Sequence, residues 1–275
     1  MLEPVVPGWA FARRLAVHEA SVHAWGPREL RDLGDAMLLH DPTDPEPFWN
    51  RVAGPSWPTG TAAFDRRLDD LVTLFATLGR LAHVRTLATA NRPVDLGDRL
   101  ARAGFRPVGM DRAMALEDPG PCLALARTFA ARPGLALEHL GQGPELRAME
   151  VARLLVQAFD VESDRLPGLG AESLAAGRRP GGAVLLLLEA GVPAAVARRL
   201  TAAGGTYLSS IATAPALQGR GYGSLVTALA VTEALADAPA FVHLLVEADN
   251  RSAIRLYERL GFVTVGEPIL DLLLR

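Results

Sequence analysis

Hydrophobic residues in the second half of the chain follow two different spacings. Continuous or alternating apolar runs predict strands, and apolar residues that recur every three or four positions predict helices. Strands are expected at 135–139, 184–188, 193–200, 206–213, 241–247, 263–265 and 269–274. Helices are expected at 145–159, 171–176, 224–236 and 251–260. Leading strands, followed by strands that alternate with helices, predict a mixed α/β sheet that the last two strands finish.

The first half carries fewer clear elements. Leu68, Leu71, Phe75 and Leu78 recur at helical spacing and predict an amphipathic helix. The elements expected after it are a strand at 84–89, a helix at 96–103 and strands at 105–108 and 112–116. Turns of proline and glycine at 119–121 and 132–134 bracket a linker that contains a short helix.

An internal repeat relates the two halves. Residues 98–109 align with residues 255–266, 157 positions later, and both segments contain Gly-Phe-x-x-Val-Gly. A repeat with a long period indicates two copies of one structural unit, and 275 residues suffice for two domains of ordinary size. The predicted organisation is a domain at 1–118, a linker at 119–134 and a second domain at 135–275.

A glycine-rich turn follows the expected strand 206–213. It reads Gln218-Gly219-Arg220-Gly221-Tyr222-Gly223 and opens an apolar helix at Ser224. The free N–H groups and the positive dipole end of such a helix bind phosphate. Two other interpretations stay open: a flexible connection, and a dinucleotide-binding fingerprint with Glu247 as the ribose-binding acid. The fingerprint is disfavoured because Ser224 occupies its third glycine position.

A second motif lies nearer the end of the chain. Residues 250–262 read Asn-Arg-Ser-Ala-Ile-Arg-Leu-Tyr-Glu-Arg-Leu-Gly-Phe. Together the two stretches resemble the GNAT superfamily of acyl-CoA-dependent N-acyltransferases, whose motifs are Gln/Arg-x-x-Gly-x-Gly/Ala and Asn-x-x-Ala-x-x-Leu-Tyr-Glu-x-x-Gly-Phe. The resemblance covers residues 135–275, with a fainter echo in the first half. It implies two tandem GNAT-like domains with the acyl-CoA N-acyltransferase fold, which is an α/β fold with a mixed sheet.

The resemblance implies acetyl-CoA as the co-substrate. Its pyrophosphate would lie on the glycine loop, and main-chain groups at the end of strand 206–213 would bind its pantetheine arm; that strand end is otherwise an ordinary buried one. Asn250 would approach the cofactor, and asparagine is also a favoured N-cap. The expected cofactor-binding residues are Ile211, Ala212, Thr213, Gln218, Gly219, Arg220, Gly221, Tyr222, Gly223, Ser224 and Asn250.

The repeat also predicts that the first copy lacks the phosphate loop. At the same offset, Gly219, Gly221 and Gly223 align with Ala62, Phe64 and Arg66, Asn250 with Pro93, and Tyr257 with Leu100. A residue with a Cβ atom does not give the close backbone approach that glycine allows. We therefore expect a degenerate N-terminal copy that does not hold CoA by this motif.

Tyr257 is the candidate catalytic residue. It shares one helix face with Ala253, Leu256 and Leu260, so a tyrosine of the core is the ordinary interpretation. Its place in the family motif favours a functional one. The thiol of CoA titrates near 8.5 and a phenol near 10, both approximate reference values. Tyr257 would therefore protonate the leaving thiolate as a general acid.

No general base is assigned. The strand 206–211 carries no carboxylate, and Glu189, His243, Glu247 or a chain of water molecules are the candidates for deprotonating an amine. A polar stretch after the first helix of this domain carries Asp160, Glu162 and Asp164. In relatives this region borders the acceptor site. The cluster either attracts a cationic amine or is a solvated loop.

Composition narrows the function classes. The formal net charge of -3 shows no excess of basic residues of the kind that nucleic-acid binding requires. All 28 basic residues are arginine, which excludes lysine Schiff bases and Walker-type loops. Cys122 is the only cysteine, so no intrachain disulfide forms, and we expect it to be a buried spectator. The histidines lack metal-ligand spacing and no apolar stretch is long enough for a bilayer, so we expect no metal, no membrane partner and a cytoplasmic protein.

The sequence thus predicts an N-acetyltransferase that transfers the acetyl group of acetyl-CoA directly to a primary amine of a small molecule or peptide. The N-terminal copy would take the place of a second subunit, which predicts a monomer with pseudo-dimeric pairing or a homodimer. The alternative is a non-catalytic acyl-CoA-binding sensor or scaffold. The fold alone does not select the acceptor.

Overall fold

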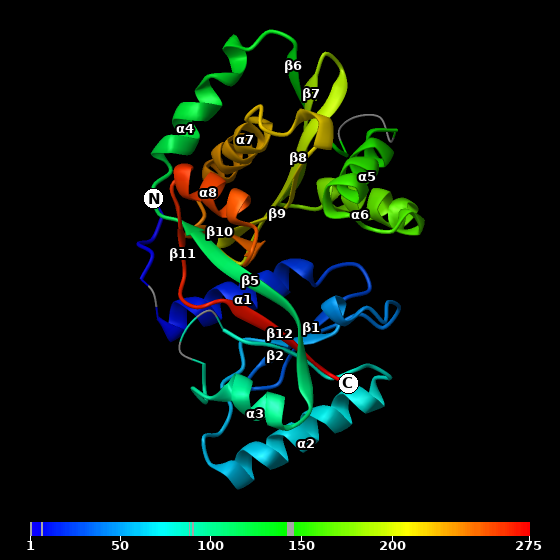
Figure 1. Cartoon of the computed structure of the whole chain (residues 1–275), viewed down its shortest axis with the longest axis vertical. Coiled ribbons are helices and arrows are strands. Elements are labelled where there is room, and N and C mark those ends of the chain that lie inside the picture. Colours follow the sequence, from blue (N-terminus) through cyan, green and yellow to red (C-terminus); the bar gives the residue numbers. More distant parts are fainter. Residues whose placement is uncertain (1, 7, 88, 90, 142–145) are drawn as a thin grey trace. The chain divides into compact units, whose positions relative to one another are not determined.

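The computed structural model describes residues 2–6, 8–87, 89, 91–141 and 146–275 (Figure 1). The chain divides into two units. Unit 1 consists of residues 1–4, 115–244 and 252–263. Unit 2 consists of residues 5–114, 245–251 and 264–275. Ala88, in the expected strand 84–89, and Glu145, at the start of the expected helix 145–159, lie outside the described residues.

The sheet of unit 1 is mostly antiparallel, and the predicted mixed α/β class is confirmed. Its strands are, in spatial order, β6 (Leu135–His139), β7 (Gly182–Glu189), β8 (Val192–Ala202), β9 (Gly205–Thr213) and β10 (Phe241–Glu247). Neighbouring strands are antiparallel except β9 and β10, which are parallel. The last residues of β10, from Leu245 onward, belong to unit 2.

Helices cover both faces of this sheet. α5 (Leu146–Phe159) and α6 (Leu166–Arg178) lie on one face, and α7 (Tyr222–Ala236) lies on the other (Figure 1). Residues 183–188 of β7 are buried without interruption, as expected for a strand covered on both sides. Leu186 and Leu188 pack with Val151 and Leu155 of α5.

The expected linker contains a helix that belongs to unit 1. α4 (Gly120–Arg127) packs on α7. Cys122 of α4 is fully buried, and its Sγ donates a hydrogen bond to the carbonyl of Leu260 at 3.2 Å. Burial raises the pKa of this thiol to about 12. A thiol with so high a pKa is not a nucleophile at neutral pH, which agrees with the expected spectator role.

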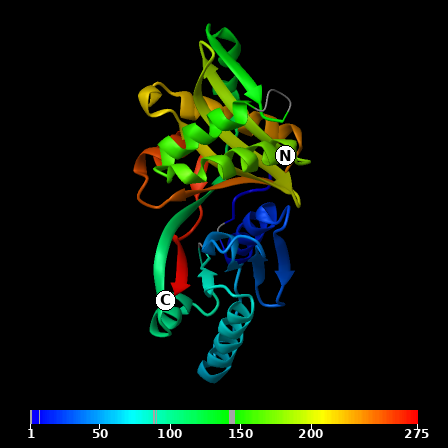
Figure 2. The ribbon, with the colours of Figure 1, turned by 90° about the vertical axis from the view of Figure 1, so that its right-hand side faces the viewer.

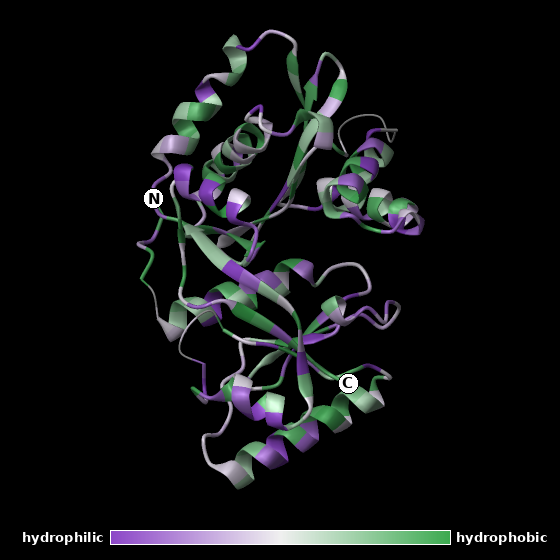
Figure 3. Ribbon diagram, in the orientation of Figure 1, coloured by the Kyte–Doolittle hydropathy of each residue, from purple (hydrophilic) through white to green (hydrophobic). Residues whose placement is uncertain are grey.

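Unit 2 contains further strands, wholly or for most of their length, and further helices. Its strands are, in spatial order, β1 (Glu29–Asp32), β2 (Met37–His40), β3 (Arg51–Ala53), β4 (His83–Arg85), β12 (Ile269–Leu274) and β5 (Phe105–Leu116). Its helices are α1 (Trp9–His23), α2 (Thr61–Thr77) and α3 (Leu96–Arg102). α2 is amphipathic, as its sequence predicts. It buries Phe64, Leu68, Leu71 and Phe75 and turns a hydrophilic face outward (Figure 3).

The C-terminal strand lies in unit 2. β12 pairs antiparallel with both β4 and β5 (Figure 2). The expectation that residues 269–274 finish the sheet of the second half is therefore wrong. An apolar run identifies a strand but not the strands with which it pairs. The expected domains 1–118 and 135–275 follow chain order, whereas the units interleave: residues 115–118 lie in unit 1 and residues 264–275 in unit 2.

β5 also differs from its prediction. It is one continuous strand, where two strands at 105–108 and 112–116 are expected. Residues 106–110 of β5 are exposed, so the apolar pattern is interrupted although the strand continues. The short strand β11 (Phe262–Thr264) pairs with β5 as well.

Buried charges hold β12 in unit 2. Arg85 donates from Nε to Asp271 Oδ1 at 2.9 Å and from Nη2 to Oδ2 at 2.6 Å, and His83 Nε2 lies 2.9 Å from Oδ1. Burial raises the pKa of Asp271, but Arg85 and His83 outweigh burial and hold that pKa well below its ordinary value. Glu19 of α1 accepts two hydrogen bonds from Arg51, at 2.6 and 2.7 Å. The network joins α1 to strands that are far apart in sequence.

Strand alternation keeps these charges apart from the apolar core of unit 2. Val84 and Leu272 pack in the cluster that α2 and α3 cover. Their neighbours Arg85 and Asp271 are paired with each other in register and point to the opposite face, because successive side chains of a strand alternate. One face of the sheet is thus apolar and the other carries the ion pairs.

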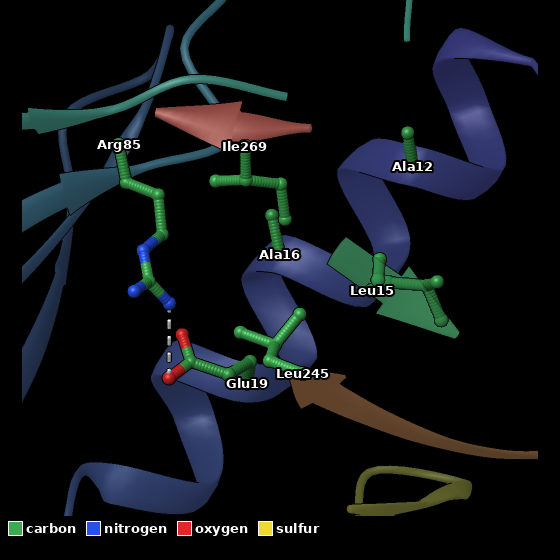
Figure 4. Close-up of a pocket in the computed structure, with 8 residues that line it drawn as sticks. Ala12, Leu15, Ala16, Glu19, Arg85, Leu245 and Ile269 are labelled. Atoms are coloured by element: carbon green, nitrogen blue, oxygen red, sulfur yellow. Dashed lines mark ion pairs between the residues drawn. The ribbon is translucent and has the colours of Figure 1, made fainter. Parts of the chain in front are cut away.

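A small pocket beside α1 touches the same network (Figure 4). It is lined by Ala12, Leu15, Ala16, Glu19, Arg85, Ala113, Leu245 and Ile269. Arg85 Nη1 lies 3.6 Å from Glu19 Oε1. The charged groups of the pocket are already paired and the rest of its lining is aliphatic. It does not suit a phosphate-bearing ligand.

We predict that Asp271→Asn destabilises the protein by about 3 kcal/mol, since breaking a buried ion pair leaves its partner charge uncompensated. The measurement is the urea midpoint of unfolding. Because the folded pKa of Asp271 is depressed, the contribution is present above the unfolded pKa, near 4, and is lost only as pH falls through the folded value. Glu267→Gln, in the exposed turn before β12, is the control. Equal midpoints for the two variants would contradict the role of Asp271.

Candidate functional site

Strand β9 separates from its parallel neighbour β10 before β9 itself ends. The ladder between β9 and β10 runs from Gly205 and Phe241 to Leu208 and Leu244, whereas β9 continues to Thr213. On the other side β9 stays paired with β8, with Ala212 opposite Val196. The end of β9 therefore has main-chain groups that the ladder with β10 does not use.

A bulge shapes this part of β9. The register with β8 shifts between Val196 and Arg198, whose partners are Ala212 and Ser209. Ser210 lies in the shifted part with a φ of 50°, a left-handed conformation that is uncommon outside glycine. Bulges bend a strand and change the direction of its groups. Ile211, Ala212 and Thr213, the expected pantetheine-binding residues, come directly after it.

The glycine loop follows β9 through a short 3-10 turn, η4 (Pro215–Leu217). Gly219 has a φ of +79° and Gly221 a φ of +83°, a backbone region that glycine enters at no steric cost. A Cβ atom built on either residue meets nothing within 4 Å. The two glycines are thus required by backbone conformation, and the space in front of them is open.

The loop delivers the N-terminus of α7. Gly221 is the N-cap residue and provides no side-chain cap, and the first helical hydrogen bond runs from Leu225 N to Gly221 O at 3.0 Å. Within the described residues, the N–H groups of 219–224 donate no hydrogen bond. Free N–H groups at a helix N-terminus bind anions. Residues Gln218 to Ser224 therefore fit a phosphate group.

Gly223 joins the loop to two other parts of unit 1. A Cβ atom on Gly223 would lie 3.0 Å from Thr213 Oγ1 and 3.5 Å from Leu256 Cδ1. A glycine is needed here because β9 and α8 (Arg251–Arg259) approach closely. The structure thereby brings together the end of β9, the loop and the helix that carries Tyr257.

Tyr257 is a buried residue of α8. It is 7% exposed, and its ring centroid lies 6.0 Å from that of Phe262 in an edge arrangement. No group in the described part of the chain hydrogen-bonds its hydroxyl. Burial raises the pKa of Tyr257 to about 12. The hydroxyl is thus protonated at neutral pH and available to donate.

The other sequence candidates lie in varied surroundings. Asn250 precedes α8 directly, but it is exposed and belongs to segment 245–251 of unit 2, so its approach to a cofactor stays a prediction. Glu247, also in that segment, is exposed. His243 is fully buried against the rings of Tyr207 and Phe241. The acidic residues Asp160, Glu162 and Asp164 are all exposed.

Glu189 has a role that the sequence did not indicate. It ends β7, and its carboxylate accepts a hydrogen bond from the hydroxyl of Tyr222, the first residue of α7. Arg220 Nη1 lies 3.6 Å from the same carboxylate. Glu189 is thus a partner of the glycine loop. No spacing in the sequence links residue 189 to residues 220 and 222, because the contact depends on how β7 packs beside α7.

The corresponding loop of unit 2 lies between β3 and α2, at residues 54–60. The repeat offset is wrong at this point: it pairs the glycines with Ala62, Phe64 and Arg66, which lie inside α2. The number of residues between the loop and the repeated helix, which is α3 in unit 2 and α8 in the second half, differs in the two copies. A single offset therefore cannot align both.

The loop 54–60 nevertheless lacks a comparable set of free main-chain N–H groups. Pro55 and Pro58 have no N–H group. Ser56 N donates to Asp35 O at 2.7 Å, and Trp57 N donates to Arg92 O at 2.9 Å. Several main-chain donors of this loop are thus absent or occupied, unlike those of the loop in unit 1.

Comparison with known proteins agrees with this architecture. Residues 185–267 match the family model of the FR47-like proteins, which are related to GNAT enzymes. This match includes β9, the glycine loop and Tyr257. The chain has the GNAT fold.

Solved structures with the GNAT fold match nearly the whole chain. A GCN5-related N-acetyltransferase from Kribbella flavida is 21% identical, with a TM-score of 0.70 and coverage of 95% of each chain. One from Sphaerobacter thermophilus is 18% identical, with a TM-score of 0.58 and coverage of 98% of this chain and 94% of that one. A tandem GNAT protein from the clavulanic acid biosynthesis pathway is 16% identical, with a TM-score of 0.59 and coverage of 98% and 89%.

No curated protein sequence matches the chain. Among the described residues, no helix combines the length and the apolar character that a bilayer requires.

We predict that Gly221→Val weakens CoA binding roughly tenfold or more, since valine is strained at positive φ and its side chain projects into the space in front of α7. Gly204→Val is the control, because Gly204 also has a positive φ, of +78°, with open space around it, and lies in the β8–β9 turn. Calorimetry measures binding, and thermal unfolding measures the cost of strain. Unchanged CoA affinity in Gly221→Val would contradict the role of the glycine loop in phosphate binding.

Proposed function

We propose that unit 1 transfers an acetyl group from acetyl-CoA to a primary amine of a small molecule or peptide by direct attack of the amine on the thioester. The observation that carries this proposal is the open glycine loop with free N–H groups, packed against the end of β9 and the helix of Tyr257. The GNAT fold supports it. A cytoplasmic location belongs to the same proposal.

The loop and strand would bind the cofactor in two parts. Gln218, Gly219, Arg220, Gly221, Tyr222, Gly223 and Ser224 would hold the pyrophosphate, and Ile211, Ala212 and Thr213 would bind the pantetheine arm through main-chain groups. Asn250 would contact the arm. Acetyl-CoA supplies an activated acyl group as a thioester. Main-chain N–H donors beside the thioester would stabilise the oxyanion of the tetrahedral intermediate, which is commonly a large contribution in acyl transfer.

Tyr257 would donate to the departing sulfur. Its pKa of about 12 keeps it protonated throughout the physiological range but makes it a weaker acid than a free phenol, whose pKa is near 10. Donation would therefore occur late, as the C–S bond breaks and the sulfur acquires the charge and basicity of a thiolate. The amine loses one proton, the thiol gains one, and the reaction consumes none overall.

The first test is turnover with a panel of amines. We expect the wild-type protein to release the thiol of CoA from acetyl-CoA in the presence of at least one small-molecule or peptide amine, and mass spectrometry to show an acetamide. A thiol-reactive dye measures the release. Calorimetric binding of acetyl-CoA with no release from any amine would favour the acyl-CoA-binding sensor or scaffold instead. Absence of CoA binding would remove both functions.

We predict that Tyr257→Phe lowers kcat about a hundredfold or more, the usual contribution of a positioned acid, and changes the dissociation constant of acetyl-CoA less than twofold. Tyr207→Phe is the matched control, because Tyr207 is also a buried tyrosine of unit 1, with the same exposure of 7%. Because the pKa of Tyr257 is raised to about 12, its ionisation should cause no loss of activity below about pH 11. Wild-type kcat in Tyr257→Phe would exclude the role.

A further inference from the structure

The glycine loop carries two polar side chains that approach the same carboxylate. The hydroxyl of Tyr222 donates a hydrogen bond to Glu189 Oε1. Arg220 Nη1 lies 3.6 Å from Glu189 Oε2, with the Arg220 side chain 57% exposed and that of Glu189 34% exposed. A negative group thus stands beside the loop that we propose as a phosphate site.

The two contacts differ in strength. Tyr222 makes a hydrogen bond, which together with the nearby charge of Glu189 raises the pKa of the phenol above its ordinary value. Arg220 is beyond hydrogen-bond distance of the carboxylate and largely in water. Exposed ion pairs of this kind contribute little to stability. Glu189 is held firmly by Tyr222, whereas Arg220 is held loosely.

We propose that Glu189 is a positioning residue that holds Arg220 in the ligand-free protein and releases it to a phosphate group of the cofactor. The inference rests on the proposed function, because it takes the glycine loop to be the phosphate site. It adds a competition between a carboxylate of the protein and a phosphate of the ligand for one guanidinium. The strength of that competition sets how well the loop distinguishes phosphorylated from unphosphorylated ligands.

The exchange is physically favourable in one direction. A phosphate offers a guanidinium short, charge-assisted hydrogen bonds, often two at once, whereas Glu189 offers an ion pair at 3.6 Å. Glu189 keeps the hydrogen bond from Tyr222 after Arg220 has left. The carboxylate of Glu189 therefore still has a hydrogen-bond donor after the ligand binds.

The test is a double-mutant cycle with Glu189→Gln, Arg220→Gln and the double variant, since such a cycle isolates the coupling between two residues. Calorimetry gives dissociation constants for CoA and for pantetheine, which lacks phosphate. Glutamine keeps an oxygen that accepts from Tyr222 but cannot hold Arg220 by charge. We expect Glu189→Gln to bind CoA about two- to fivefold more tightly at low ionic strength, the range that an exposed ion pair allows.

Four further results are expected. Arg220→Gln weakens CoA binding, and in that background Glu189→Gln has no effect. Pantetheine binding changes in none of the variants. The gain from Glu189→Gln shrinks in about 0.5 M salt, where charges are screened within a few ångströms.

The matched control is Asp237→Asn, which removes a carboxylate at the other end of α7, where Asp237 pairs with Arg199 at 2.7 Å. It changes the net charge equally and should leave CoA binding unaltered.

An effect of Glu189→Gln that persists without Arg220 would overturn the exchange and show direct repulsion between Glu189 and the ligand. If CoA binds, Gly221→Val abolishes binding and Glu189→Gln has no effect, this inference fails and the proposed function stands. If CoA does not bind the wild-type protein, the proposed function itself fails.

Discussion

The early end of the ladder between β9 and β10 is the constraint on which the candidate site depends. Main-chain groups in a complete ladder are fully used by their neighbours. β9 loses its partner after Leu208 and bends at the bulge near Ser210, so residues 209–213 keep donors and acceptors on one side. The same bend leads the chain into the turn that presents Gly219 and Gly221. A regular strand in this place would supply neither the unpaired main-chain edge nor the open glycine turn.

The surroundings of α7 hold the loop in place. Leu225, Val226, Ala228, Ala230 and Val231 are all fully buried, which is typical of a helix that is apolar on every side. A helix so enclosed has no freedom to rotate its N-terminus. The donors of the loop are thereby held in place before a ligand arrives, and a preorganised site binds its ligand at a lower cost of ordering.

Local chemistry made the glycine loop of unit 1 predictable, whereas long-range pairing hid the partners of the C-terminal strand. Positive φ at Gly219 and Gly221, and the close approach at Gly223, are demands that only glycine meets, so the sequence records them. The position of β12 depends on Asp271 meeting Arg85, which is 186 positions earlier. Nothing near residue 271 reveals that partner. The link between Glu189 and Tyr222, 33 positions apart, was hidden in the same way.

The two loops show that the same fold forms with or without a set of free main-chain donors. Both units place a loop between a strand and a helix, and in both the helix begins directly after a glycine, Gly60 or Gly221. Gly60 has an extended conformation, with a φ of -69°, whereas Gly221 is left-handed. In unit 2 the carbonyls of Asp35 and Arg92 accept the N–H groups of Ser56 and Trp57, so the loop is satisfied by its own unit. In unit 1 the corresponding donors are unpaired, which costs stability unless water or a ligand accepts them. The fold tolerates either arrangement, and the unpaired donors are what make the loop of unit 1 a candidate for binding an anion.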